Sequence, residues 1–431
     1  MLHTVFTSWP LFLGMGLLMI GNGLQGTLLG VRAGLEGFPT TVIGLVMAGF
    51  YVGLLLGSAA APRLIARVGH VRVFAAFTAI ASATVLLHAV FVSPFVWALI
   101  RIVAGFSFAA LFIVAESWLN SETRNENRGK VLSVYLIVSF AGASAGQILL
   151  NAGDPAGFVL FVMVSVLLSV AVVPMLLSTG SAPAMPRASR LHLVGLFRTS
   201  PLGVAGTFTS GLMMGSVMGM GAVFATQAGL GVAQVSSFMF ATLAGVMLFQ
   251  FPLGAVADRF DRRIVIIVVA ACSGAMALGA AHFEGWTGLG LMVIAAALGF
   301  PLYSISIAHT NDYLEHDAMV AAASGLMAIN GIGSVIGPLA VSLSMSLMGA
   351  PGFALLLGVA QLTLALFGVY RSFRRQAVPL DERGPTIIIP RATAVATVLA
   401  QETALERMDS GADDDDEART DDPQETSASL V

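Results

Sequence analysis

Long apolar stretches, separated by short polar ones, run through most of the chain. About 20 helical residues cross a hydrocarbon core of roughly 30 Å, and runs of this length recur along the sequence. The alternation typical of outer-membrane barrels is absent, so we expect helices that satisfy their own backbone hydrogen bonds in lipid. With charges, Pro and Gly as boundaries, the pattern predicts twelve transmembrane helices near residues 8–31, 41–62, 73–92, 95–118, 130–151, 156–178, 202–227, 235–256, 264–283, 286–309, 320–347 and 352–371.

Polar stretches divide this all-α polytopic chain further. The segment "TGSAPAMPRASRLHLVGLFRTSP" at 179–201 contains Pro and three arginines, and it predicts a cytoplasmic linker between two six-helix halves, 1–178 and 202–375. Residues 376–431 are polar and become strongly acidic in "DSGADDDDEARTDDPQETS". Such a composition buries no core, so we expect this tail to be disordered.

Composition supports the membrane assignment and the distribution of charge orients the chain. Hydrophobic residues make up 57% and charged residues 10%, with a mean hydropathy of +0.88, whereas soluble domains are about 25% charged. Of the 21 Lys and Arg residues, Arg32 falls in a predicted external loop and Arg101 inside a span, while the others fall on the cytoplasmic side. We therefore expect a multi-pass protein of the bacterial inner membrane with both termini in the cytoplasm.

Two segments of the first half have counterparts in the second. "PRLIARVGHVR" (62–72) follows the second predicted helix, and "GAVADRFDRR" (254–263) follows the eighth. "RIVAGFSFAALFIVAE" (101–116) in the fourth helix is matched by "AAALGFPLYSISIAHTND" (295–312) in the tenth. Two similar halves in parallel orientation are expected of one transporter architecture.

These segments resemble the signature motifs of the major facilitator superfamily. The family's cytoplasmic motif is matched in the second half, with Asp261 where the family usually has glycine, and the first half keeps only part of it. Arg101 and Gly105 resemble the family's motif in the fourth helix. The residues that carry the cytoplasmic motif are Gly254, Asp258, Arg259, Arg262 and Arg263 in the second half and Arg67, Gly69 and Arg72 in the first.

A narrower likeness is carried by three further segments. "NENRGKVLSVYLIVSFAGASAGQILL" (125–150), "GFPLYSISIAHTNDYLEH" (299–316) and "INGIGSVIGP" (329–338) look like the YcaD-type branch of bacterial facilitators. The superfamily resemblance implies a twelve-helix fold and transport by rocking of the two halves. The branch resemblance implies no settled substrate.

Charged residues at the cytoplasmic helix ends are candidates for a gate. Asp258 and Arg259 suit a latch that closes one alternating-access state, and the alternative is a charge cluster that only fixes topology. Glu116 and Asp312 end the fourth and tenth helices at matching places. We expect ion pairs with the basic loop of the same half, and the alternative is a proton relay. The expected basic partners are Arg67 and Arg72 for Glu116, and Arg259 and Arg263 for Asp312.

Arg101 is the strongest single candidate for a functional residue. A guanidinium several residues inside a span is costly and nearly always faces the bundle interior, a cavity or a partner. The family resemblance implies coupling to protonation or anchoring of substrate. The alternative is a buried donor that bonds to helix-end carbonyls.

Three polar stripes at helical spacing are candidates for an aqueous path. They are Asn22 with Gln25; Ser144, Gln147 and Asn151; and Tyr303, Ser306 and Thr310 with the adjoining His309. Such side chains also hold neighbouring helices together, which is the alternative interpretation.

Several classes of protein lack support in the sequence. The chain has no ATP-binding G-x-x-x-x-G-K-[ST] loop, no H-E-x-x-H zinc pair and no G-x-S-x-G nucleophile elbow. We therefore expect a secondary transporter of a small organic solute rather than an enzyme, with no cofactor, no metal and no nucleic-acid partner. We also expect a monomer in the lipid bilayer, with protons as the candidate coupling ion.

A non-transporting membrane sensor on the same fold is the alternative function. The substrate stays open as well. Arg101 suits an anionic solute, while a mostly apolar wall with scattered amides would suit hydrophobic drugs or neutral metabolites equally.

Overall fold

The computed structural model describes residues 9–122, 128–176 and 193–374, and it places most of them in helices. Twelve helical segments of this described part are long and apolar enough to cross a membrane, which confirms the predicted fold class. Residues 179–192 of the predicted linker and the predicted tail at 376–431 lie outside the described residues.

The first half contains six spanning helices and a short 3₁₀ turn. They are α2 (Trp9–Leu35), α3 (Thr40–Val68), α4 (His70–Val90), α5 (Pro94–Glu122), α6 (Arg128–Leu149), η2 (Leu150–Ala152) and α7 (Val159–Leu176). The second half begins with a short helix inside the stretch predicted as a linker. Its helices are α8 (Leu193–Thr199), α9 (Pro201–Gln227), α10 (Val232–Arg259), α11 (Arg262–His282), α12 (Gly285–Gly299), α13 (Leu302–Asn311), α14 (His316–Met348) and α15 (Pro351–Ser372).

The second spanning helix is longer than its hydropathy predicts. Instead of ending near residue 62, α3 runs through Pro62 to Val68, and Gly69 ends it with a φ of 93°. The Gly69 amide donates to the Ile65 carbonyl at 2.8 Å. Ile65 is buried, so packing sustains the last turn beyond the apolar window.

The tenth span is broken where the sequence predicts one continuous helix. Pro301 has no backbone N–H, so the carbonyl one turn earlier loses its helical donor and α12 ends at Gly299. At the break, the Phe300 carbonyl accepts hydrogen bonds from the Ser210 hydroxyl of α9 at 3.0 Å and from the Tyr303 amide at 3.2 Å. The break places Phe300 toward the centre of the molecule.

Within each half, glycines let helices approach closely. A Cβ on Gly105 of α5 would collide with the Phe50 backbone of α3, and one on Gly53 would lie 2.8 Å from the Phe106 nitrogen. Membrane helices pack through such small residues because lipid supplies no hydrophobic force between them. The glycine of the fourth-helix motif therefore has a packing role in this protein.

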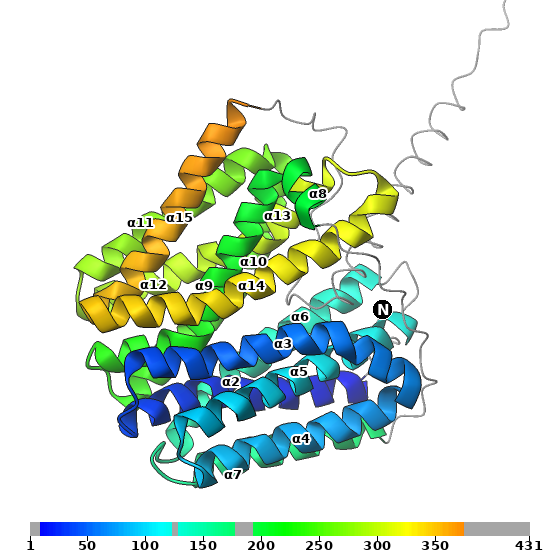
Figure 1. Cartoon of the computed structure of the whole chain (residues 1–431), viewed down its shortest axis with the longest axis vertical. Helices are drawn as coiled ribbons and strands as arrows, with labels where there is room; N and C mark the ends of the chain where they lie inside the picture. Colours follow the sequence, from blue (N-terminus) through cyan, green and yellow to red (C-terminus); the bar gives the residue numbers. More distant parts are fainter. Residues whose placement is uncertain (1–8, 123–127, 177–192, 375–431) are drawn as a thin grey trace, which may run out of the picture.

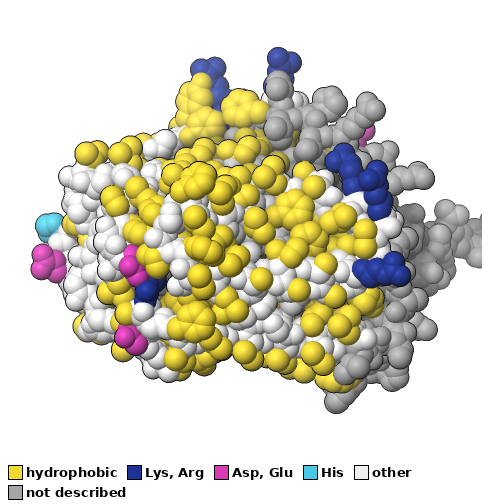
Figure 2. All heavy atoms as spheres, turned by 60° about the horizontal axis from the view of Figure 1, so that its bottom comes forward, with side chains coloured by type: hydrophobic (Ala, Val, Ile, Leu, Met, Phe, Trp, Pro, Cys, Tyr) yellow, Lys and Arg dark blue, Asp and Glu magenta, His cyan; other side chains and the backbone are white. Residues whose placement is uncertain are grey.

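The two halves lie side by side, with the first half below the second in Figure 1. The helices that meet between the halves are α2 with α9, α3 with α14, and α6 with α10. In Figure 1 α14 runs along α3, while α4 and α7 lie at the outer side of one half and α11 and α15 at the outer side of the other. The surface in Figure 2 carries a broad region without charged side chains, between a group of Lys and Arg at one end and, at the other, acidic groups with a basic side chain among them. This pattern suits a lipid-embedded bundle.

Candidate functional site: a central cavity between the halves

A cavity lies between the two halves, and both halves line it. It contains about 1200 Å³ of space free of atoms, part of it open to solvent. The broken tenth span reaches it only through Phe300. The other lining residues are Asn22, Gly23, Gly26 and Thr27 of α2; Phe50, Tyr51, Leu54 and Leu55 of α3; Arg101 and Phe112 of α5; Phe140, Ala143 and Gln147 of α6; Met214 and Met218 of α9; Met239 and Leu243 of α10; and Met327, Asn330, Gly331 and Ser334 of α14.

Contacts between the halves close one end of this cavity. The amide of Gln227 donates to the Thr40 hydroxyl at 2.8 Å, and the amide of Asn151 donates to the Ser236 hydroxyl at 2.9 Å. Ser236 in turn donates to the Gln147 carbonyl at 2.6 Å. We call this end, which holds the α2–α3 and α9–α10 connections, the closed end.

Arg101 lines the cavity as the sequence predicts. Arg101 is only 4% exposed, and its guanidinium carbon lies 4.5 Å from the centre of the Phe50 ring. A cation over an aromatic face is favourable, particularly where water is excluded. Within the described residues the guanidinium makes no ion pair, and Nε has no hydrogen-bond partner.

Two of the predicted polar residues join Arg101 in the lining. Gln147 accepts a hydrogen bond from the Thr27 hydroxyl at 2.5 Å and donates to the Gly23 carbonyl at 3.0 Å, so this amide links α6 to α2. Asn22 also lines the cavity, and its amide makes no hydrogen bond to another described residue. Asn22 is therefore available to a solute, whereas Gln147 is held.

The other predicted polar residues lie elsewhere. Gln25 is buried outside the cavity, and Asn151 is exposed at the closed end. Tyr303, Ser306 and His309 are buried in α13, and none of them lines the cavity. His309 packs edge-on against Tyr313, with ring centres 5.2 Å apart. The stripe in the tenth helix therefore faces protein rather than the central cavity.

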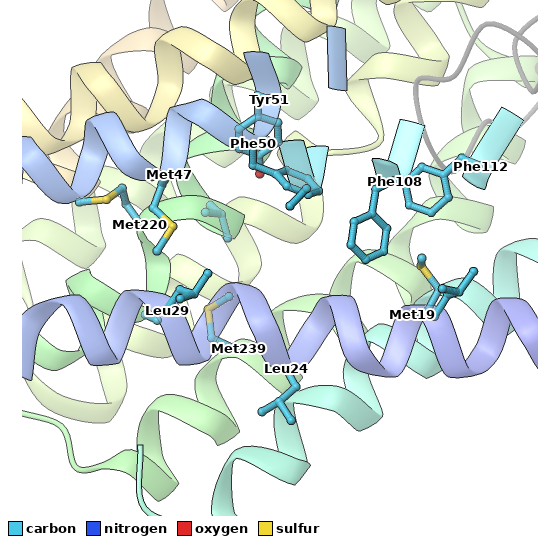
Figure 3. Close-up of a cluster of buried hydrophobic side chains, with 14 of the residues drawn as sticks. Met19, Leu24, Leu29, Met47, Phe50, Tyr51, Phe108, Phe112, Met220 and Met239 are labelled. Atoms are coloured by element: carbon cyan, nitrogen blue, oxygen red, sulfur yellow. The ribbon is translucent and has the colours of Figure 1, made fainter. Parts of the chain in front are cut away.

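Aromatic and methionine side chains form much of the cavity wall, and the sequence did not single them out. Figure 3 shows three of these lining residues, Phe50 and Tyr51 of α3 and Phe112 of α5, within a cluster of buried side chains. Phe108 of α5 belongs to the same cluster but does not line the cavity. In sequence these residues look like any other apolar member of a span. Asn330 and Ser334 had a usable signal, because they are four residues apart and share a helical face.

At the end opposite the closed end, the second half holds a group of ion pairs. Arg262 pairs with Asp312, with Asp258 at 3.1 Å, and its guanidinium also donates to the Ala308 carbonyl at 3.3 Å. Arg263 pairs with Asp261 at 2.7 Å, and the Asp261 carboxylate caps α11. These contacts join α10, α11 and α13 of one half.

This arrangement corrects the predicted partners of Asp312. We expected Arg259 and Arg263, but Asp312 pairs with Arg262, because Arg262 begins α11 and points into the bundle while Arg263 turns back to Asp261. Among the ion pairs between described residues, Arg259 has none. The gating role proposed for Asp258 and Arg259 is a separate matter, and it stays a prediction.

The first half differs at the matching place. Glu116 is fully buried and accepts a hydrogen bond from the Tyr135 hydroxyl at 3.2 Å. Arg67 and Arg72, its predicted basic partners, are exposed and make no ion pair with another described residue. Ser117 lies 3.1 Å from the ring of His70, which links α5 to the start of α4.

Removal of the Ser236 hydroxyl should weaken the closed end. Ser236→Ala removes the bond to the Gln147 carbonyl and the acceptor of Asn151, each worth about 1 kcal/mol. We expect broader distances between spin labels on α6 and α10 at this end. Ser237→Ala is the matched control, because its hydroxyl bonds only within α10, to the Ala233 carbonyl at 2.9 Å. Equal broadening in both variants would contradict the assignment.

The sequence model of the protein family "Major Facilitator Superfamily" matches residues 11–247 and 203–400 of this chain. The "Uncharacterized MFS-type transporter YcaD" of Salmonella newport (strain SL254) is 28% identical over 336 residues, covering 76% of this chain and 86% of the relative. In the described residues no group of three or more His, Cys, Asp and Glu suits a metal ion.

Solved structures share the fold. The nucleoside transporter NupG (D323A mutant) has a TM-score of 0.72 at 15% identity, covering 84% of this chain and 99% of that one. A D-xylose-proton symporter has a TM-score of 0.66 at 15% identity, covering 87% and 99%. The family model covers most of the sequence, and the twelve apolar helices match the family's architecture. The chain therefore belongs to the Major Facilitator Superfamily and is a multi-pass transporter of the bacterial inner membrane rather than an enzyme.

Proposed function

We propose that this transporter carries a small organic solute through the central cavity by alternating access. The halves at 1–178 and 202–375 would rock about the cavity, and the segment 179–201 would link them. The observation that supports this most directly is that both halves line the cavity while hydrogen bonds between them close one end. A site at the interface of two repeats is where such a motion exposes a solute to each side in turn.

The charge pattern supports an orientation for this state. Arg32 lies near the closed end, whereas Arg63, Arg67, Arg198 and Arg374 lie toward the other. Basic residues concentrate on the cytoplasmic side of membrane proteins. With both termini in the cytoplasm, the closed end faces outward and the cavity faces inward.

Cysteine labelling tests this orientation. In a Cys272→Ser background, cysteines at Arg32 or Asp154 should react with an impermeant thiol reagent added outside intact cells, because both positions lie at the closed end. Cysteines at Arg67 or Arg374 should react only after the membrane is permeabilised. The reverse pattern would overturn the orientation.

Protons are the proposed coupling ion, and Glu116 is the proposed residue for this step. Its carboxyl is buried near the end of α5 and accepts from Tyr135, so a change of protonation there would alter a helix contact. Two solved structures that share this fold are proton symporters, one of D-xylose and one of fucose. A pH gradient should drive solute uptake in vesicles with the native chain and not with Glu116→Gln.

The function itself is tested by binding followed by flux. Purified full-length protein would be heated with panels of metabolites and drugs, since a ligand that binds only the native state raises the unfolding temperature. Each stabilising compound would then be offered to vesicles containing the protein. Flux through these vesicles, absent from protein-free ones, supports transport; binding without flux would favour a sensor. Sedimentation of the same sample tests whether the protein is a monomer.

A further inference from the structure

The charge of Arg101 is unbalanced in the central cavity. Among the described lining residues there is no carboxylate, and the Arg101 guanidinium has no ion pair within the described chain. A buried charge without a counter-ion is costly, and a bound anion would remove that cost. We propose that the solute is an organic anion with a flat apolar body, whose anionic group binds Arg101. This inference rests on the proposed transport function.

A structural role for Arg101 would look different, as Arg262 demonstrates. Arg262 is equally buried, but it reaches two carboxylates and the Ala308 carbonyl. Arg101 instead lies over the Phe50 ring and has neither a carboxylate nor a carbonyl partner among the described residues. The two arginines of one chain therefore differ in the property that matters, which is whether the protein itself satisfies the guanidinium.

Both walls of the cavity are largely apolar, and they differ in their polar groups. The first half contributes the Arg101 guanidinium and the Asn22 amide, which makes no hydrogen bond to another described residue. The rest of this wall includes Phe50, Leu54, Leu55, Phe112 and Phe140. On the second half, Asn330 and Ser334 donate to carbonyls of α9, at 3.2 Å from Thr207 and 3.2 Å from Gly211. The rest of that wall is largely apolar, with Met214, Met218, Met239, Leu243, Phe300 and Met327.

This asymmetry gives the solute an orientation. Its anionic group would lie against the first half, where the guanidinium offers several donors to one carboxylate or a similar group. Its body would lie between aromatic rings such as Phe50 and Phe112, which stack on flat groups, and the methionines of the second half, which adapt to irregular apolar shapes. Arg101 lies seven residues after Pro94, where α5 begins at the closed end, and this is roughly 10 Å along the helix. The anion would therefore bind deep in the cavity, far from its open end.

Three probes that share one ring system test the charge preference. 2-Naphthoate, 2-naphthamide and 2-naphthylmethylammonium would be titrated into the purified full-length protein, and the unfolding temperature would give their affinities. We expect naphthoate to bind at least about tenfold more tightly than the amide, because a charge-assisted bond replaces a neutral one. The ammonium should bind most weakly, since it meets a like charge.

Two variants assign the preference to Arg101. Arg101→Gln should remove the difference between naphthoate and naphthamide, and Arg101→Lys should keep part of it, since lysine retains the charge but not the planar group. Arg63→Gln, which removes an exposed arginine of α3, is the matched control and should keep the full preference. If Arg101→Gln does not fold, the lysine variant and the native titration still carry the test.

The inference would be overturned if the amide or the ammonium bound as tightly as naphthoate, if Arg101→Gln kept the preference, or if naphthoate at millimolar concentration gave no response. These outcomes differ from a failure of the proposed function. A protein that binds naphthoate through Arg101 but gives no flux of any bound compound would retain the anion site and lose the transport assignment.

Discussion

Asp312→Ala should lower the free energy of unfolding by about 3 kcal/mol, because it leaves a buried guanidinium without its buried partner. The side chains of Arg262 and Asp312 are 2% and 4% exposed, so water cannot replace the lost carboxylate. The pair joins the start of α11 to the end of α13, and its loss should loosen the contact between these helices. The native and variant proteins would each be unfolded in mixed micelles by titration with a denaturing detergent. The two titrations give the difference in the free energy of unfolding.

Asp258→Ala is the matched control for this experiment. It removes the other carboxylate that contacts Arg262, but Asp258 is 39% exposed, so we expect a loss of no more than about 1 kcal/mol. A larger loss for Asp258 than for Asp312 would show that the solvent-facing carboxylate dominates, contrary to the burial of the two groups. Solute binding in the central cavity should persist in both variants, because neither residue lines it.

Hydropathy was sufficient to predict the spans because lipid imposes both length and backbone pairing on each helix. It was insufficient at helix ends. The prediction stopped at Pro62, yet α3 continues to Val68, since a buried Ile65 holds a turn that lies past the apolar window. The prediction also missed the break after Gly299, although Pro301, which causes it, was a visible signal in the sequence.

Part of the polar lining was predicted from the sequence, namely Arg101, Asn22 and Gln147. Arg101 was predicted to face the interior because exposure of a guanidinium to lipid costs too much free energy. Asn22 and Gln25 share a helical face, but one lines the cavity and the other is buried outside it. The apolar wall could not be found at all, since residues such as Met239 are equally suited to lipid, to a helix contact and to a solute.

Neighbouring residues in a charged stretch also point in different directions. Arg262 and Arg263 are about 100° apart around α11, so one reaches Asp312 in the bundle and the other returns to Asp261 at the cap. Sequence alone placed Asp312 near this basic stretch but chose the wrong arginines. The choice depends on how α11 is rotated against α13, which tertiary packing sets.

Gly44→Val should drive the closed end open, and this is the largest conformational effect that we expect. Gly44 of α3 lies against α14, where a Cβ would come within 2.7 Å of the Pro338 carbonyl oxygen and collide with the Ser342 side chain. Overpacking of this kind costs about 1–3 kcal/mol. Because the contact joins the two halves, separation of the halves relieves the collision without unfolding either one. The ratio of open to closed should rise by roughly tenfold to a hundredfold.

Spin labels at Leu45 of α3 and Leu343 of α14 measure this change, since both side chains are more than half exposed beside the contact. We expect the distance distribution to shift to longer values in Gly44→Val. Gly34→Val is the matched control, because a Cβ at Gly34 of α2 meets nothing within 4 Å. It should leave the distribution as in the native protein. If Gly44→Val folds normally and keeps the native distribution, the α3–α14 contact does not hold the closed end.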